Sequence, residues 1–311
     1  MKLLFVIDPL ATLKPYKDSS VAMMRAGATR GHAVFATETQ NLQVRDGRTL
    51  ATCMPLAVHS SNDWYTAAEP TTLALTEFDA VVMRTDPPVD TEYLLATQLL
   101  EIAVQNGARV WNRPSALRDL NEKLAILNFP QFITPTLISA QTNDIASFLA
   151  THADIIVKPL TEMGGSGIFR LTDRDPNRNA ILETLTYRGH RPIMAQRYLP
   201  EIAQGDKRIL IIDGEIVPWA LARIPLPGET RGNLAAGGTG RAQALSPRDR
   251  EIAKTIAPWT KQQGLFLVGL DVIGDCLTEI NVTSPTGFQE ITAQTGFDVA
   301  AHFIIALERA G

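Results

Sequence analysis

Apolar and polar positions in the first third of the chain follow two alternating patterns. Residues 2–7 (KLLFVI) form a continuous apolar run, which is typical of a strand buried on both faces. Residues 91–107 instead carry apolar side chains at helical spacing and end in Asn-Gly, a helix-terminating pair. Further strand-like runs occupy residues 32–38, 78–84 and 108–112, and a capped helix is expected between residues 18 and 31. This alternation predicts a parallel sheet with flanking helices over residues 1–120.

From about residue 121 the pattern changes to α+β. Residues 207–224 place an Asp213-Gly214 pair between two β-rich arms, which predicts a hairpin, and residues 264–282 predict a second one. Strands are also expected at residues 135–139, 154–160 and 191–200, and helices at residues 121–127, 143–153, 246–263 and 297–311. The second part of the chain should therefore contain mostly antiparallel sheets.

Composition narrows the class of protein. Of the 311 residues, 45% are hydrophobic and 20% charged, as in a globular protein, and the net charge of −4 does not favour a nucleic-acid binder. The two cysteines, Cys53 and Cys276, suit a reducing compartment rather than a disulfide framework. Asp8-Pro9 interrupts the first apolar run, and no window reaches the roughly 18 apolar residues of a membrane span. We expect a cytoplasmic protein without nucleic-acid or membrane partners.

Asp271, Glu279 and Asn281 are candidate ligands for Mg²⁺. Glu279 and Asn281 project to the same face of one predicted strand, and two carboxylates with an amide oxygen form a hard-oxygen site. The alternative is a polar face in contact with solvent. A two-residue turn at Gly274-Asp275 would pair Asp271 with Thr278. An odd, three-residue loop with a bulge would pair Asp271 with Glu279, so the metal hypothesis predicts an odd loop.

Two further features are candidates for binding phosphate. Residues 158–169 (KPLTEMGGSGIF) combine Lys158 with a glycine-rich turn whose backbone N–H groups could hold phosphate oxygens, although a plain hairpin loop is the alternative and the Walker A ending is missing. Arg208 and Arg223 lie almost opposite each other on the first hairpin, and two facing cations repel unless an anion lies between them.

Residues 229–241 (ETRGNLAAGGTGR) show neither helical nor strand spacing. They could form a linker, a disordered segment or a loop that closes over a negatively charged ligand. The stretch leaves one strand of a hairpin and leads into a capped helix of the same domain, which argues against a linker. Its glycines permit close approach, and Arg231 and Arg241 supply charge. We therefore predict a closing loop that excludes water when the site fills.

Six phrases of the chain give it a family resemblance. These are MRTDPPVDTEY (83–93), NRPSALRDLNEKL (112–124), MAQRYLP (194–200), GDKRILIIDGE (205–215), ARIPLPGETRGNLAAGGTGR (222–241) and LTEINVTSPTG (277–287). The order of lysines, glycine-rich loop, arginine-bearing hairpin and D…E-x-N is similar to the ATP-grasp superfamily, and the phrases resemble the prokaryotic-type glutathione synthetase family. One departure is Thr161-Glu162, where the family pattern has Asp-Gly.

The resemblance implies an ATP-grasp fold that combines α/β and α+β parts. It predicts an amino-terminal parallel-sheet (pre-ATP-grasp) substrate domain at residues 1–122. A small central lid domain would follow at residues 123–200, and a carboxy-terminal antiparallel-sheet catalytic domain at residues 201–311. The resemblance further implies a homo-oligomer, either a dimer or a tetramer.

The implied reaction joins γ-L-glutamyl-L-cysteine to glycine with ATP, through an acyl phosphate, to give glutathione, ADP and phosphate. ATP is the co-substrate and Mg²⁺, or Mn²⁺, the metal. The implied metal ligands are Asp271, Glu279 and Asn281, and the implied catalytic residues are Arg208, Arg223 and Arg231. The implied nucleotide-binding residues are Lys123, Lys158, Gly164, Gly165, Ser166, Gln196, Arg197, Tyr198, Leu199 and Asp206. The implied peptide-binding residues are Arg84, Asn233, Ser284 and Thr286. The sequence shows no general base for the glycine amine.

Three alternatives stay open beside this reading. Another ATP-grasp carboxylate–amine ligase could use the same phosphate and metal residues on a different acid, although the phrases RTDPP and RGNLAAGG favour the first family. A non-catalytic nucleotide-binding module would not need the complete metal trio and both arginines. A dinucleotide oxidoreductase is disfavoured, because no G-x-G-x-x-G follows the first strand.

Overall fold

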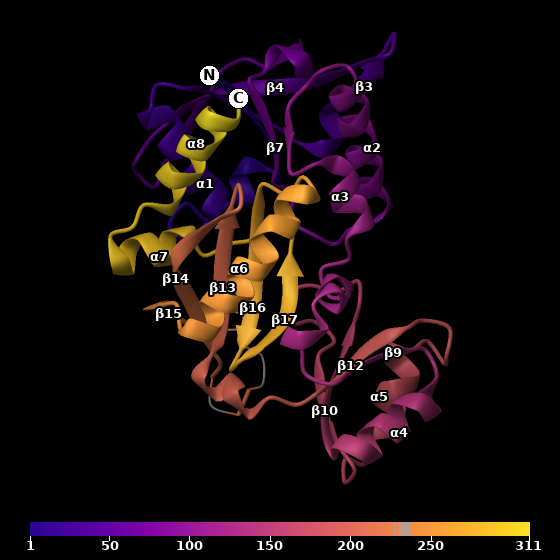
Figure 1. Cartoon of the computed structure of the whole chain (residues 1–311). Coiled ribbons are helices and arrows are strands. Elements are labelled where there is room, and N and C mark those ends of the chain that lie inside the picture. Colours follow the sequence, from indigo (N-terminus) through magenta and orange to yellow (C-terminus); the bar gives the residue numbers. More distant parts are fainter. Residues whose placement is uncertain (227, 230–231, 233–236) are drawn as a thin grey trace.

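The computed structural model describes residues 1–226, 228–229, 232 and 237–311. In these residues the strands form three sheets that follow one another along the chain (Figure 1). The two chain ends lie close together beside the first sheet, and the second sheet lies at the opposite end of the molecule (Figure 1). Among the described residues no helix combines the length and the apolar character that crossing a membrane requires.

The first sheet has a parallel centre, as the sequence predicts. β1 (Lys2–Val6) pairs in parallel with β2 (Ala33–Thr37) and β7 (Ala80–Met83), and β7 pairs in parallel with β8 (Val110–Trp111). Residues 3–6 of β1 are fully buried, which explains their continuous apolar run. The helices of this part are α1 (Ser19–Thr29), α2 (Thr91–Gln105) and α3 (Pro114–Asp119).

The same sheet also has an antiparallel extension that the hydrophobic pattern does not predict. Its strands are β3 (Leu42–Arg45), β4 (Arg48–Val58), β5 (Tyr65–Ala67) and β6 (Thr71–Ala74). The long strand β4 pairs with β2, β3, β5 and β6, so the complete sheet is mixed rather than purely parallel.

The second sheet is small and antiparallel, in the order β11-β10-β12-β9. Its strands are β9 (Thr136–Ser139), β10 (Asp154–Pro159), β11 (Phe169–Thr172) and β12 (Ile193–Arg197). The helices α4 (Thr142–His152) and α5 (Arg178–Leu185) cover one of its faces and share a small apolar core with it (Figure 1).

The third sheet is antiparallel, in the order β15-β14-β13-β16-β17. Its strands are β13 (Asp206–Ile212), β14 (Glu215–Ile224), β15 (Thr239–Ala244), β16 (Leu267–Ile273) and β17 (Cys276–Asn281). Side chains alternate between two cores: Ile209 and Ile211 share a core with α6 (Pro247–Gln262), whereas Leu210 and Ile212 share one with α7 (Phe288–Thr295) and α8 (Val299–Ala310).

Two sequence-based expectations need correction here. The helix predicted at residues 121–127 is only a short 3₁₀ helix, Leu124–Asn128, and the side chains of the three residues before it bond to other parts of the chain. The closing loop predicted at residues 229–241 cannot include its last three residues, since Thr239–Ala244 forms the edge strand β15 against β14. Residues 230–231 and 233–236 of that prediction lie outside the described residues.

Asn112 joins the first sheet to the third. This buried side chain donates from Nδ2 to the carbonyls of Leu267 (2.8 Å) and Val282 (2.7 Å). Its Oδ1 accepts from the amides of Phe266 (2.7 Å) and Leu267 (2.8 Å). One side chain therefore satisfies four backbone groups that would otherwise be buried without partners.

We expect Asn112→Asp to lower the free energy of unfolding by at least about 2 kcal/mol, because a carboxylate cannot donate to two buried carbonyls. Urea unfolding at neutral pH measures this loss. Asn106→Asp is the matched control, since Asn106 donates to the Gly47 carbonyl at an exposed position, and it should cost less than about 1 kcal/mol. Equal losses in the two variants would contradict the joining role of Asn112.

Candidate active site

A cavity of about 560 Å³ lies where the three parts of the chain meet. The first part contributes residues 12–14 and 17–18 and the pair Asp86-Pro87, the second part contributes residues 162–166 and 196–199, and the third part contributes the face of its sheet. This volume is in the range of small-molecule sites. Most side chains predicted for function line it: Lys123, Lys158, Gly164, Gly165, Ser166, Gln196, Arg197, Tyr198, Leu199, Asp206, Arg208, Arg223, Asp271, Glu279, Asn281, Ser284 and Thr286.

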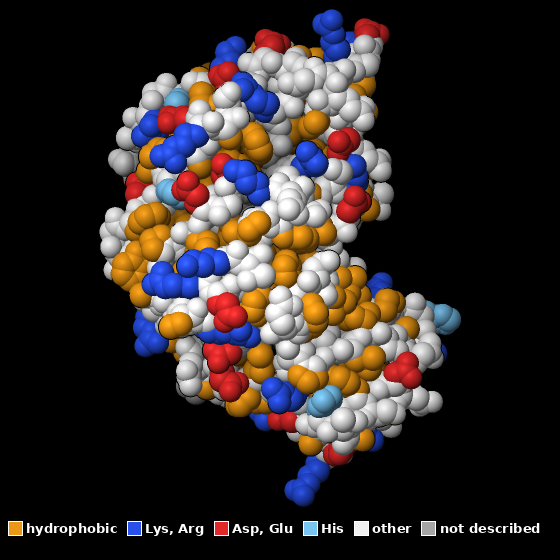
Figure 2. Space-filling view, viewed as in Figure 1, with side chains coloured by type: hydrophobic (Ala, Val, Ile, Leu, Met, Phe, Trp, Pro, Cys, Tyr) orange, Lys and Arg blue, Asp and Glu red, His pale blue; other side chains and the backbone are white. Residues whose placement is uncertain are grey.

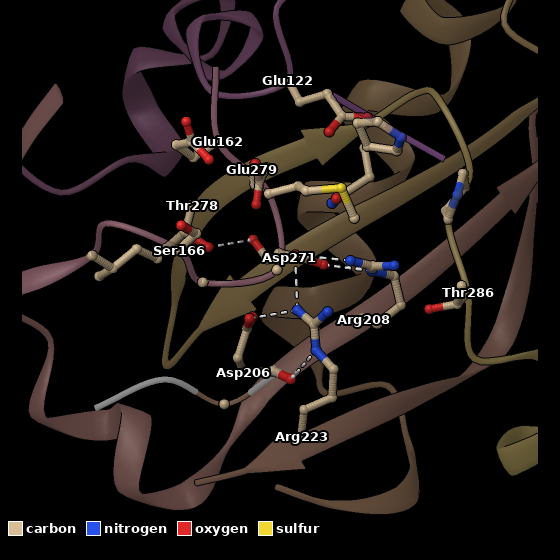
Figure 3. Close-up of a pocket in the computed structure, with 18 of the residues that line it drawn as sticks. Glu122, Glu162, Ser166, Asp206, Arg208, Arg223, Asp271, Thr278, Glu279 and Thr286 are labelled. Carbon is tan, nitrogen blue, oxygen red and sulfur yellow. Dashed lines mark hydrogen bonds and ion pairs between the residues drawn. The ribbon is translucent and has the colours of Figure 1, made fainter. Parts of the chain in front are cut away.

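One side of the cavity, called the charged wall, contains Asp206, Arg208, Arg223, Asp271 and Glu279. Asp271 lies at its centre, between the two arginines (Figure 3). Arg208 binds its carboxylate through two nitrogens, at 2.6 and 3.0 Å, and Arg223 reaches it at 2.7 Å. Burial alone would raise the pKa of Asp271, but the two guanidinium groups outweigh burial and hold the pKa below its ordinary value. The predicted pairing of both arginines with one anion is thus met by a carboxylate of the chain itself.

Asp206 completes this group by pairing with Arg223 (Figure 3). Burial raises the pKa of Asp206 to about 6, against the lowering effect of Arg223. One carboxylate oxygen binds Arg223, whereas the other, Oδ1, is buried and has no hydrogen-bond partner among the described residues. A buried acceptor of this kind suits a ligand hydroxyl group.

The register of the second hairpin brings the predicted metal ligands together. Asp271 on β16 pairs with Glu279 on β17, as the metal hypothesis requires. The predicted three-residue loop is wrong, because Ile273 pairs with Cys276 across a two-residue turn. The odd residue is instead a bulge at Thr278, whose hydroxyl donates to the Asp271 carbonyl at 3.1 Å.

Two lysines reach the same wall, one from the second part of the chain and one from the segment that connects the first part to the second. Lys123 Nζ lies 3.1 Å from Glu279 Oε1 and donates to the Glu162 carbonyl at 2.6 Å. Lys158 Nζ donates to the Thr278 carbonyl at 3.1 Å, and burial lowers the pKa of Lys158. Lys123, Lys158, Arg208 and Arg223 therefore line one cavity together with their acidic partners, and four cations at one cavity suit a phosphate chain.

The glycine-rich segment covers this space. Gly164, Gly165 and Gly167 all have positive φ, and the Ser166 amide donates to the Met163 carbonyl at 3.1 Å. At Gly167 a Cβ would lie 2.8 Å from Pro159 Cγ, so both the backbone angle and the packing require glycine there. The segment forms a compact turn whose glycines expose backbone to the cavity.

Residues 196–199, at the end of β12 and predicted to bind the nucleotide, line the cavity, but two of their amides already have partners. The amides of Arg197 and Tyr198 donate to the carbonyls of Pro135 and Asp154, both at 3.0 Å. Arg170 stacks on the Tyr198 ring at 3.8 Å and supports it from behind. Hydrogen bonds to a purine would therefore come from other groups of residues 196–199.

The predicted peptide-binding residues divide into two groups. Ser284 and Thr286 line the cavity, and the Ser284 hydroxyl donates to Asp86. Arg84 is buried and is not among the described lining residues; it donates to the Ser20 hydroxyl (2.9 Å) and the Pro285 carbonyl (3.1 Å). Arg231 and Asn233 lie outside the described residues.

Several charged residues that line the cavity were not predicted from the sequence: Asp8, Lys14, Lys17, Asp18, Asp86 and Glu290. A signal for two of them existed. Asp8 and Asp86 follow the adjacent parallel strands β1 and β7, and ligands of open α/β sheets bind at the carboxyl ends of such strands. The Asp86 amide donates to Asp8 at 3.0 Å.

The donor set fits a hard divalent cation. Asp271 and Glu279 face each other across two strands, and Asn281 lies on the same face of β17 as Glu279. In the described residues no cluster of three or more histidine, cysteine, aspartate or glutamate side chains is arranged for a metal. The candidate site thus depends on two carboxylates, one amide and oxygen atoms of the ligand, which is the coordination that Mg²⁺ prefers.

The cavity lies between two antiparallel sheets and is lined by lysines, arginines and a D…E-x-N group. This combination defines an ATP-grasp ligase. The sequence models for the prokaryotic glutathione synthetase N-terminal domain and ATP-grasp domain match residues 1–118 and 122–296. The chain belongs to the prokaryotic glutathione synthetase family.

Curated relatives are similar over the whole chain. The glutathione synthetase of Neisseria meningitidis serogroup A is 58% identical, over 99% of this chain and 98% of the relative. That of Ralstonia nicotianae is 55% identical, over 100% and 96%.

Solved structures agree in fold. The D-cycloserine synthetase DcsG has a TM-score of 0.69 at 15% identity, over 99% of this chain and 100% of the other. The ATP-grasp ligase PsnB, complexed with a minimal precursor, has a TM-score of 0.66 at 17% identity, over 100% and 99%. At these identities the likeness concerns the fold alone.

Without nucleotide, we expect Asp271→Asn to lower the free energy of unfolding by about 3–5 kcal/mol, because two buried arginines lose their shared anion. Since the pKa of Asp271 is lowered in the folded chain, this stabilisation is present above about pH 4 and is lost on acidification. Urea unfolding at pH 7 and below measures both effects.

Asp154→Asn serves as the control for this prediction. Asp154 also binds an arginine through both oxygens, at 2.6 to 3.2 Å from Arg170, but in a more exposed position. Its loss should cost less than about 1 kcal/mol. A comparable cost in the two variants would mean that Asp271 does not hold the arginines as described.

Proposed function

We propose that this chain ligates γ-L-glutamyl-L-cysteine to glycine with ATP, giving glutathione, ADP and phosphate. One observation carries the proposal: Lys123, Lys158, Arg208, Arg223 and the Asp271–Glu279–Asn281 group line the same cavity as Ser284 and Thr286. Sequence identity of 50–58% over the full chain to curated glutathione synthetases supports the choice of substrates.

At the nucleotide end, Lys123, Lys158 and the glycine-rich segment with Gly164, Gly165 and Ser166 would bind the phosphates. Residues 196–199 would contact the purine, with Gln196 held in place by its hydrogen bond to Thr136 Oγ1 at 3.0 Å. The unpartnered Oδ1 of Asp206 would accept from a ribose hydroxyl. These roles agree with the charge and the shape of the cavity wall.

Asp271, Glu279 and Asn281 would hold Mg²⁺, or Mn²⁺, and the structure of PsnB with Mg and ADP supports magnesium use in this fold. When bound, the cation neutralises phosphate charge. Arg208 and Arg223, which pair with Asp271 in the structure described here, would then be free to bind the transferring phosphoryl group and the oxyanion that forms on the carbonyl.

At the peptide end, opposite charges lie close together, which suits a dipeptide carrying both ammonium and carboxylate groups. Lys14 and Lys17 line the wall with Asp8, Asp86 and Glu290. Glu290 Oε2 is buried and has no partner among the described residues, so an ammonium group would satisfy it.

Ser284 and Thr286 would contribute hydroxyl groups, and Arg84 would support this segment through Pro285. We retain Arg231 as a catalytic residue and Asn233 as a peptide-binding residue on the family resemblance alone.

The chemistry assigns little covalent work to side chains. The cysteinyl carboxylate attacks the γ-phosphoryl group of ATP, ADP leaves, and the glycine amine then displaces phosphate from the acyl phosphate. The cavity holds the reactants together and the arginines neutralise the charge that builds up on oxygen. Closure over the cavity would protect the acyl phosphate from water.

We also propose three domains, at residues 1–122, 123–200 and 201–311, a homo-oligomer and a cytoplasmic location. The bounds of the two matched family models, 1–118 and 122–296, support the first domain boundary. The three sheets, which fall within the three proposed domains, support the second.

A coupled assay of ADP release tests the function. We expect rapid release with γ-glutamylcysteine and glycine together, slow release when either is omitted, and glutathione as the product by mass spectrometry. Other acid–amine pairs, including D-alanine with D-alanine, provide the comparison. Turnover with one of these and none with γ-glutamylcysteine would assign the chain to another ligase activity.

We expect Asn281→Ala to lower turnover by about 10- to 100-fold, the usual effect of disturbing a metal site. Stability should change by only about 1 kcal/mol, because within the described residues the Asn281 side chain makes a single hydrogen bond, from Nδ2 to the Gly269 carbonyl at 3.1 Å. The assay above and urea unfolding measure the two quantities. Unchanged turnover would remove Asn281 from the metal site.

A further inference from the structure

Three consecutive residues, Asn121, Glu122 and Lys123, make polar contacts with two segments that border the cavity. These are the glycine-rich segment and β17 with the residues that follow it. Asn121 donates from Nδ2 to the Leu160 carbonyl at 2.8 Å, just before the glycine-rich segment. Lys123 reaches the Glu162 carbonyl within that segment and the Glu279 carboxylate on β17. The reaction proposed above uses only Lys123, so Asn121 and Glu122 still need an explanation.

Glu122 binds the chain directly after the metal strand. One carboxylate oxygen, Oε1, accepts three hydrogen bonds: from the Val282 amide (2.7 Å), the Thr283 amide (3.0 Å) and the Thr283 hydroxyl (2.9 Å). The backbone carbonyl of Glu122 accepts a fourth, from the Ile280 amide at 2.9 Å. The side chain and backbone of one residue thus fix residues 280–283.

This anchored stretch includes a candidate metal ligand and leads into the peptide side. Asn281 lies between Ile280 and Val282, and the bound backbone on both sides leaves it little freedom to turn. Ser284 follows Thr283 directly and faces the cavity. Glu122 itself lines the cavity, on the same side as Glu279 (Figure 3).

We propose that Glu122 is a positioning residue that holds Asn281 in its metal-binding orientation and Ser284 in its peptide-binding position. Its Oε1 acts as a fixed acceptor for three donors of the strand end. This inference rests on the proposed function, because it concerns the metal site of the same reaction.

Replacing the Glu122 carboxylate with an amide has different expected effects if the carboxylate is a hydrogen-bond acceptor or if it is a charged catalytic group. In Glu122→Gln the amide oxygen can still accept from Val282 and Thr283, so a positioning residue is largely preserved. In Glu122→Ala the three donors lose their acceptor and the strand end is released. If the carboxylate instead removed a proton from the amine, the glutamine variant would be as inactive as the alanine variant.

Binding of Mn²⁺ to the full chain in saturating ADP, followed by electron paramagnetic resonance, tests the proposal without turnover. For Glu122→Ala we expect a 10- to 100-fold weaker Mn²⁺ affinity, the range found for residues that orient metal ligands. Affinity for ADP without metal should stay nearly unchanged. The Michaelis constant for the dipeptide should rise, and Glu122→Gln should restore most of both losses.

Two further variants keep the test sharp. Thr283→Val removes one of the three donors and keeps both amides, so it should weaken Mn²⁺ binding in the same direction but less, even if Glu122→Ala does not fold. Glu101→Gln removes a carboxylate that pairs with Arg118 at 3.2 Å, and it should leave Mn²⁺ binding unchanged.

Unchanged Mn²⁺ affinity in Glu122→Ala and Thr283→Val would overturn the proposal, as would a glutamine variant as weak as the alanine variant. Failure of the proposed function itself would be seen separately, since the unaltered chain would then form no glutathione from γ-glutamylcysteine and glycine, whether or not it binds Mn²⁺ with ADP.

Discussion

The shared ion pairing of Asp271 is the constraint on which the rest of the charged wall depends. Two buried guanidinium groups are costly unless an anion satisfies both, and Asp271 binds Arg208 and Arg223 within 3.0 Å. The backbone is shaped around this contact. At Gly269 a Cβ would lie 2.7 Å from Arg208 Cδ, so glycine lets that side chain cross β16. The bulge at Thr278 then places Glu279 opposite Asp271.

The cavity depends equally on contacts between parts of the chain that are distant in sequence. Asn112, at the end of the first sheet, bonds to residues 266, 267 and 282 of the third part, and Glu122 bonds to residues 282 and 283. The connection between the first and second sheets is therefore part of the active-site wall rather than a free linker.

Period-two and helical patterns predicted the strands and helices that bury a continuous face. The period of two also predicted that Glu279 and Asn281 lie on the same face of their strand. Other features were beyond local patterns. The bulge at Thr278 carries a hydrogen bond to the Asp271 carbonyl, and Arg84, which is not among the described lining residues, donates to Ser20 and Pro285, both distant in sequence. The family phrases supplied most site residues, whereas Asp8 and Asp86 required the adjacency of β1 and β7.

The charge balance of the wall would link nucleotide binding to metal binding. Lys123 pairs with Glu279, and Arg208 pairs with Asp271. Arg223 pairs with both Asp206 and Asp271, so these three cations already have carboxylate partners within the chain, whereas Lys158 donates to a backbone carbonyl. A nucleotide alone would bring its phosphates against Asp271 and Glu279 as well as against the cations. In the proposed function, a divalent cation would remove that conflict by taking those carboxylates as ligands, and the arginines would then be free for the phosphates. The same residues would thus stabilise the folded chain without ligand and hold a metal–nucleotide pair, with ion partners exchanged rather than buried charges left alone.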